Sequence, residues 1–96
     1  MKAAFFVPFK NNLKTITLMR TMTCRELGGA CDTPFTAETF EEIAAMSKQH
    51  GMQMFQQKDA AHLKAMEEMK SVMQNPEAMQ KWYEAKRAQF ESLPNT

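Results

Sequence analysis

Three helix-start signals divide the chain from residue 39 onward and limit the folds open to it. The first is a capping box, in which Thr39 and Glu42 satisfy each other's free backbone N–H groups. Asp59 is a favoured N-cap, and Asn75 followed by Pro76 joins a cap to a residue suited to the first helical turn. The spacing predicts three helices, over about 40–56, about 60–74, and from 75 to the stop at Pro94.

Each predicted helix has one apolar face. The faces consist of Phe40, Ile43, Ala44, Ser47, Met54 and Phe55, then His62, Leu63, Met66, Met69 and Met73, then Met79, Trp82, Tyr83, Phe90 and Leu93. Gly51 is expected to weaken the first helix in its middle or to end it early. Because almost no loop separates the last two helices, we expect an angled or antiparallel pair.

A different periodicity precedes the helices. Threonines alternate with apolar residues, so that one face holds Thr15, Thr17, Thr21 and Thr23 and the other holds Ile16, Leu18, Met22 and Cys24. Gly28-Gly29 marks a reversal, and Cys31 to Thr36 can return as a second strand that Pro34 limits to an edge. A hairpin-like unit over about 18–37 follows. The predicted fold is therefore α+β, with a short N-terminal β-hairpin-like unit followed by three helices.

The chain has 96 residues, which is room for one domain and too little for most large enzyme architectures. We expect a single small domain over 19–96, made of a core over 19–58 and a helix pair over 59–96. Residues 1–25 carry five basic and no acidic side chains. We interpret residues 1–18 as a poorly ordered basic tail, or as an upstream extension if Met19 is the natural start.

The N-terminal segment also indicates where in the cell the protein is located. Its apolar stretch is short, contains Pro8, and is followed at once by Lys10, which makes it a poor signal peptide. No apolar run approaches the roughly 18 residues that a membrane span needs. We therefore predict a cytoplasmic protein with no membrane partner.

Two cysteines and two histidines form the one candidate site. Cys24 and Cys31 flank the glycine pair, so a tight reversal brings their side chains near each other. His50 shares the apolar side of the first helix, because it follows Ile43 by seven residues. A metal site of Cys24, Cys31 and His50 follows, with His62 or Asp32 as candidates for a fourth ligand. Two thiolates and an imidazole suit Zn²⁺, which would also brace a small domain.

Other interpretations of the cysteines stay open at this point. Both thiols can be reduced, half-buried small hydrophobes. The spacing also allows a disulfide or a redox pair, although a cytosolic compartment disfavours a disulfide. His62 equally fits a histidine at a helix start or at the edge of the core.

An ordered set of short motifs resembles a known family. The set consists of Thr23-Cys24-Arg25-Glu26-Leu27-Gly28, then Cys31-Asp32, then Thr39 with Glu41-Glu42, then His50-Gly51. Over about residues 19–56 it is similar to a bacterial domain of unknown function, whose members are described as predicted small metal-binding proteins. The resemblance implies that Cys24, Cys31 and His50 are the family positions. Many members carry a further His about one turn before the His-Gly pair, where this chain has Ala44-Ala45-Met46-Ser47.

The remaining function classes are disfavoured. With a net charge of +1 the chain lacks the excess of positive charge that is typical of nucleic-acid-binding proteins. The basic residues near Trp82 are interleaved with Glu77, Glu84 and Glu91, which would repel a phosphate backbone. No oxyanion element or phosphate-binding loop is present, so we expect no enzyme. The ten methionines fit packing better than a copper site. The main alternative is a structural or protein-interaction module with reduced cysteines, self-associating through a Met-rich surface of the helix pair.

Overall fold

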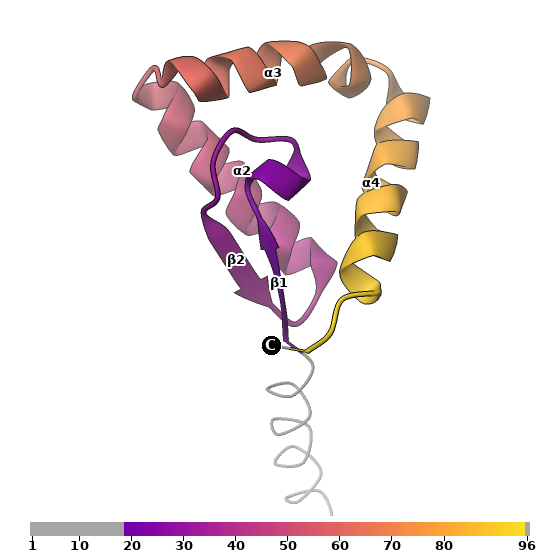
Figure 1. Ribbon diagram of the computed structural model, residues 1–96. Coiled ribbons are helices and arrows are strands. Elements are labelled where there is room, and N and C mark those ends of the chain that lie inside the picture. The colour runs from indigo at the N-terminus through magenta and orange to yellow at the C-terminus, as the bar shows by residue number, and fades with distance from the viewer. Residues whose placement is uncertain (1–18, 96) are drawn as a thin grey trace, which may run out of the picture.

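The structure is a computed structural model that describes residues 19–95, and Figure 1 shows its course. The predicted tail over 1–18 lies outside the described residues. The elements follow in the order β1 (Arg20–Thr23), the 3-10 turn η1 (Arg25–Leu27), β2 (Pro34–Ala37), α2 (Phe40–Gln56), α3 (Ala60–Met73) and α4 (Pro76–Glu91). The predicted α+β fold, a hairpin followed by three helices, is confirmed.

The two strands pair antiparallel and separate an apolar face from a threonine face. Met22 lies opposite Phe35, and both are buried. On the other face the hydroxyls of Thr21 and Thr36 lie 2.7 Å apart. Within the described strand, the alternation of threonines and apolar residues therefore produces the two predicted faces, because only one face of this small sheet is covered.

The three helix-start signals all act as caps. Thr39 Oγ1 accepts a hydrogen bond from the Glu42 N–H at 3.2 Å, and the Glu42 carboxylate accepts one from the Thr39 N–H, also at 3.2 Å. The side chains of Asp59 and Asn75 also accept backbone N–H groups and so cap α3 and α4. Gly51 does not end α2. It lies where α3 comes close, and a Cβ added there would sit 3.9 Å from Met66 Cε.

Helices α2, α3 and α4 form three sides of an open triangle, and the hairpin lies along α2 (Figure 1). The last two helices therefore meet at an angle rather than packing antiparallel. The core lies where the hairpin meets the start of α2 and the end of α4. Its buried members are Met22, Cys24, Leu27, Phe35, Ala37, Phe40, Ile43 and Phe90.

One contact network closes the corner between the end of α4 and β1. Arg20 Nε donates a hydrogen bond of 2.9 Å to the backbone carbonyl of Leu93. The same guanidinium stacks on the Phe90 ring at 5.5 Å from its centroid. The end of α4 is thus held against the first strand, although residues far apart in sequence make the contact.

Within residues 19–95, every helix is too short or too polar to cross a membrane.

Candidate metal centre

The connection between the strands sets the positions of both cysteines. The Cys24 N–H donates to the Thr33 carbonyl and the Arg25 N–H to the Cys31 carbonyl, each at 2.8 Å, so the two segments stay paired beyond the strands. Between them η1 turns the chain and Gly28 ends the turn at φ 93°, in the left-handed region. A 3-10 turn of three residues has no periodic signal, which is why sequence patterning did not predict it.

Gly29 makes room for the first cysteine. A Cβ at this position would overlap the Sγ atom of Cys24, and it would also lie 3.0 Å from the Cys24 carbonyl oxygen. The glycine pair therefore does more than reverse the chain, because the second glycine lets the Cys24 side chain fold back toward the loop.

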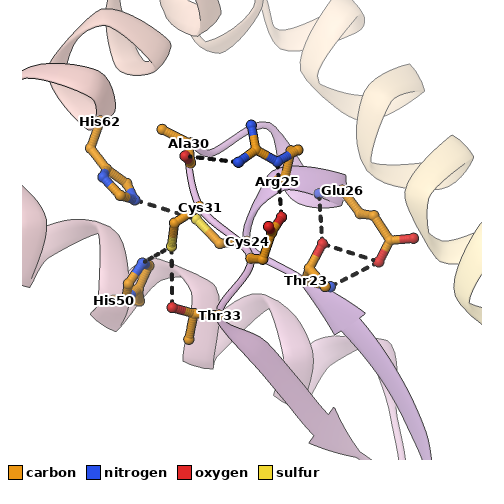
Figure 2. A network of polar contacts seen from close by, with 10 residues as sticks. Thr23, Cys24, Arg25, Glu26, Ala30, Cys31, Thr33, His50 and His62 are labelled. Carbon is orange, nitrogen blue, oxygen red and sulfur yellow. Dashed lines mark hydrogen bonds and ion pairs between the residues drawn. The ribbon is translucent and has the colours of Figure 1, made fainter.

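Four side chains from three parts of the chain converge beside this loop. Cys24 and Cys31 come from the loop, His50 from α2 and His62 from α3 (Figure 2). One ligand atom of each lies within 4.8 Å of all the others. The sulfur–nitrogen contacts are 3.6 Å for Cys24 with His62 and 3.3 Å for Cys31 with His50.

These distances are close to those of a formed metal site. With metal–sulfur bonds of about 2.3 Å and metal–nitrogen bonds of about 2.0 Å, the donor atoms of a tetrahedral site lie about 3.3–3.8 Å apart. The two sulfur–nitrogen distances, 3.6 and 3.3 Å, fall in that range. All four ligand atoms lie within 4.8 Å of one another, so the cluster is compatible with a metal ion once its widest separations close to the tetrahedral range.

Asp59 orients one of the two histidines. Its carboxylate caps α3 by accepting the His62 N–H at 3.0 Å, and the same oxygen lies 2.6 Å from His62 Nδ1. With the Nδ1 proton directed to Asp59, Nε2 of His62 faces the sulfurs with its lone pair. Histidine ligands of metals are commonly held by a carboxylate in this way. The contact also raises the pKa of His62 and lowers that of Asp59.

The two thiols differ in their ionisation. The Thr33 hydroxyl lies 3.1 Å from Cys31 Sγ and is the main reason that the pKa of Cys31 falls to about 6. A hydrogen bond with His50 acts in the same direction, and partial burial opposes the shift. Burial raises the pKa of Cys24, which is 4% exposed. One sulfur is therefore a thiolate near neutral pH, and the other is a protonated thiol that a metal would have to deprotonate.

The structure brings Cys24, Cys31 and His50 together and adds His62 as the fourth member. Asp32, the other candidate for that position, is outside the group, since it forms an ion pair of 2.9 Å with Arg25. That guanidinium also donates to the Ala30 carbonyl (Figure 2). His62 lies in the first turn of α3, consistent with the interpretation as a histidine at a helix start, but it is buried and faces the cysteines.

Sequence reasoning missed the partners of the site. Asp59 was predicted only as a helix cap, and Thr33 was not singled out at all. The one available signal was the spacing of Asp59 and His62, because an N-cap residue and the third residue of its helix lie side by side. Both cysteines are free thiols in the structure.

Comparisons of the chain with models of protein families, with curated proteins and with solved structures find no match. Membership of the family of predicted small metal-binding proteins therefore stays a prediction. The class of protein that the fold and site define is a small α+β domain with a Cys2His2 cluster compatible with metal binding.

Proposed function

We propose that the protein binds one Zn²⁺ ion through Cys24, Cys31, His50 and His62. The observation that carries the proposal is the convergence of four ligand atoms within 4.8 Å of one another. Two sulfurs and two imidazole nitrogens match the ligand preference of zinc in four-coordinate sites. Carboxylate-rich sites suit Mg²⁺ or Ca²⁺ instead, and no carboxylate belongs to this cluster.

The role we propose is structural or storage-like rather than catalytic. A catalytic zinc site has three protein ligands and one open position for water or substrate. Here four protein ligands would complete a tetrahedron, and two of them are buried. The ion would join the interstrand loop to α2 and α3, which is the kind of cross-link that a domain of this size gains most from.

The test is the metal content of protein purified under reducing conditions. We expect one zinc per chain in the wild type and in Asp32→Asn, which changes the acid outside the cluster. The double variant Cys24→Ser, Cys31→Ser is expected to contain almost none. Equal metal content in the wild type and the double serine variant would remove the proposal.

A second candidate function is a module that self-associates through apolar side chains. Four large apolar side chains within residues 19–95 favour it, since Met46 is 40%, Met52 56%, Phe55 62% and Met73 62% exposed. Sedimentation velocity at low and high protein concentration tests it. A concentration-dependent dimer is expected if the helices pair, and a monomer at all concentrations argues against it.

A further inference from the structure

The open triangle of helices encloses a hollow next to the proposed metal centre. Its volume is about 650 Å³, and its walls come from α2, α3, α4 and the interstrand loop. A Cβ at Gly28 would touch Met69 Sδ at 3.4 Å and Trp82 at 3.6 Å, so the loop forms the floor on which these two side chains rest. A hollow of this size falls within the range of small-molecule sites.

The walls are apolar and adaptable. Met66, Met69 and Met73 line one side from α3, and Trp82 and Tyr83 line another from α4. Methionine side chains are flexible and polarizable, so they can fit a chain-like apolar molecule without a rigid shape. The methionine stripe of α3 is thus a wall of a hollow, whereas periodicity alone suggested buried packing.

One lysine gives this apolar surface a charge preference. Among the lining residues within 19–95, Lys48 is the only lysine or arginine, and no aspartate or glutamate lines the hollow. Its neighbours one turn away along α2 carry no acid, being Ala44, Ala45, Gly51 and Met52. None of the ion pairs among residues 19–95 includes it.

A second cation lies on the α4 side. Lys86 Nζ is 5.9 Å from the centroid of the Trp82 ring. Lys86 is not a lining residue, but it places a second ammonium group beside Trp82, which is one. An anionic group at Lys48 would face no acid among the lining residues. A cationic headgroup at the same position would be repelled by Lys48.

We propose that the hollow binds an unesterified medium-chain fatty acid, with the hydrocarbon chain between the methionines and Trp82 and the carboxylate at Lys48. Burial of apolar surface supplies the affinity, and the ammonium group supplies the selection for an anion. The hollow borders the metal cluster, because Cys24, His50 and His62 are among its lining residues. The side chains assigned to the fatty acid, Lys48 and the methionines, are not members of that cluster.

Trp82 is the single tryptophan of the chain and lines the hollow from α4, so its fluorescence reports contact between a ligand and that wall. The probe is 10-bromodecanoate, whose bromine quenches tryptophan emission on contact, titrated below its micelle concentration. We expect saturable quenching that decanoate reverses by competition. Decanol is expected to compete roughly tenfold more weakly, and decyltrimethylammonium more weakly still.

Substitutions of Lys48 test whether its charge, rather than a change in the fold, determines binding. Lys48→Glu is expected to weaken 10-bromodecanoate binding at least tenfold, and Lys64→Glu, on α3 outside the hollow, to leave it unchanged. Lys48→Met keeps a good helix former and should make decanoate and decanol equal competitors. Each variant should retain the circular dichroism and zinc content of the wild type, which keeps failure here distinct from failure of the metal proposal.

Several results would overturn the proposal. These are no saturable quenching, competition by decyltrimethylammonium equal to that by decanoate, or unchanged affinity in both Lys48 variants. Binding to phosphatidylglycerol vesicles without competition by decanoate would also overturn it, as would a stable dimer that excludes 10-bromodecanoate because a second copy fills the hollow.

Discussion

At the scale of single residues, the site depends on a carboxylate that has two tasks. Asp59 caps α3 through the His62 N–H and holds His62 Nδ1 at 2.6 Å. The first task was predictable, because an N-cap is a local sequence feature. The second was not, since it depends on how the imidazole ring turns once α3 packs near the interstrand loop.

Asp59→Asn separates these two tasks. Asparagine caps helices as well as aspartate does, so we expect α3 and the fold to persist. The amide cannot hold the imidazole as a carboxylate does, and zinc affinity should fall by about 10–100-fold. Competition with a zinc chelator measures the affinity. Asp32→Asn is the matched control and should bind as the wild type does; equal affinity in both variants would contradict the assigned role of Asp59.

The two thiols should react at different pH. In metal-free, reduced protein, Cys31 is expected to be alkylated by iodoacetamide with a midpoint near its pKa of about 6. Burial raises the pKa of Cys24, so its alkylation should require a higher pH than that of an ordinary cysteine. Mass spectrometry of each peptide follows the reaction, and Thr33→Val should shift the Cys31 midpoint upward. Identical profiles for both cysteines would refute this difference.

At the scale of elements, the long helices were predictable and the short turn was not. Thr39, Asp59 and Asn75 mark helix starts by local chemistry, and α2 spans Phe40–Gln56 as its capping box and periodicity predicted. The turn η1 depends on Gly28 at φ 93° and on backbone pairing across the loop, which no periodic pattern records. The juxtaposition of Cys24 and Cys31 was predictable from the glycine pair, but its detailed geometry was not.

Two glycine substitutions should act in opposite directions. Gly29→Ala places a Cβ against Cys24 Sγ and must displace the sulfur, so zinc affinity and stability should both fall. Gly51→Ala meets only Met66 Cε at 3.9 Å, an ordinary contact, and should stabilise α2 by about 0.5–1 kcal/mol. Urea unfolding and chelator competition measure the two effects. A Gly29→Ala protein with wild-type zinc affinity would show that the loop does not set the Cys24 position.

At the scale of the whole molecule, the three helices form a triangle (Figure 1), the buried core is small, and a hollow of about 650 Å³ lies among the helices and the interstrand loop. The angles at its corners depend on side-chain packing between distant segments, as at Arg20 and Leu93, so the sequence could indicate only an angled or antiparallel pair. The same is true of the hollow, because helical periodicity does not distinguish a buried face from one that lines a cavity.

A domain with so small a core should depend on the metal cross-link for part of its stability. An ion that binds only the folded state stabilises it by about 2.7 kcal/mol when its free concentration is 100 times Kd. We expect a chelator to lower the thermal midpoint by roughly 10 °C or more. Calorimetry of the double variant Cys24→Ser, Cys31→Ser is the control, and its midpoint should not respond to the chelator. An unchanged wild-type midpoint would count against a structural ion.

The most direct test of the proposed zinc site is X-ray absorption at the zinc edge of the purified, reduced protein. We expect two sulfur neighbours at about 2.3 Å and two nitrogen neighbours at about 2.0–2.1 Å. Those neighbours would be Cys24, Cys31, His50 and His62. A first shell of nitrogen and oxygen alone, without sulfur, would contradict it.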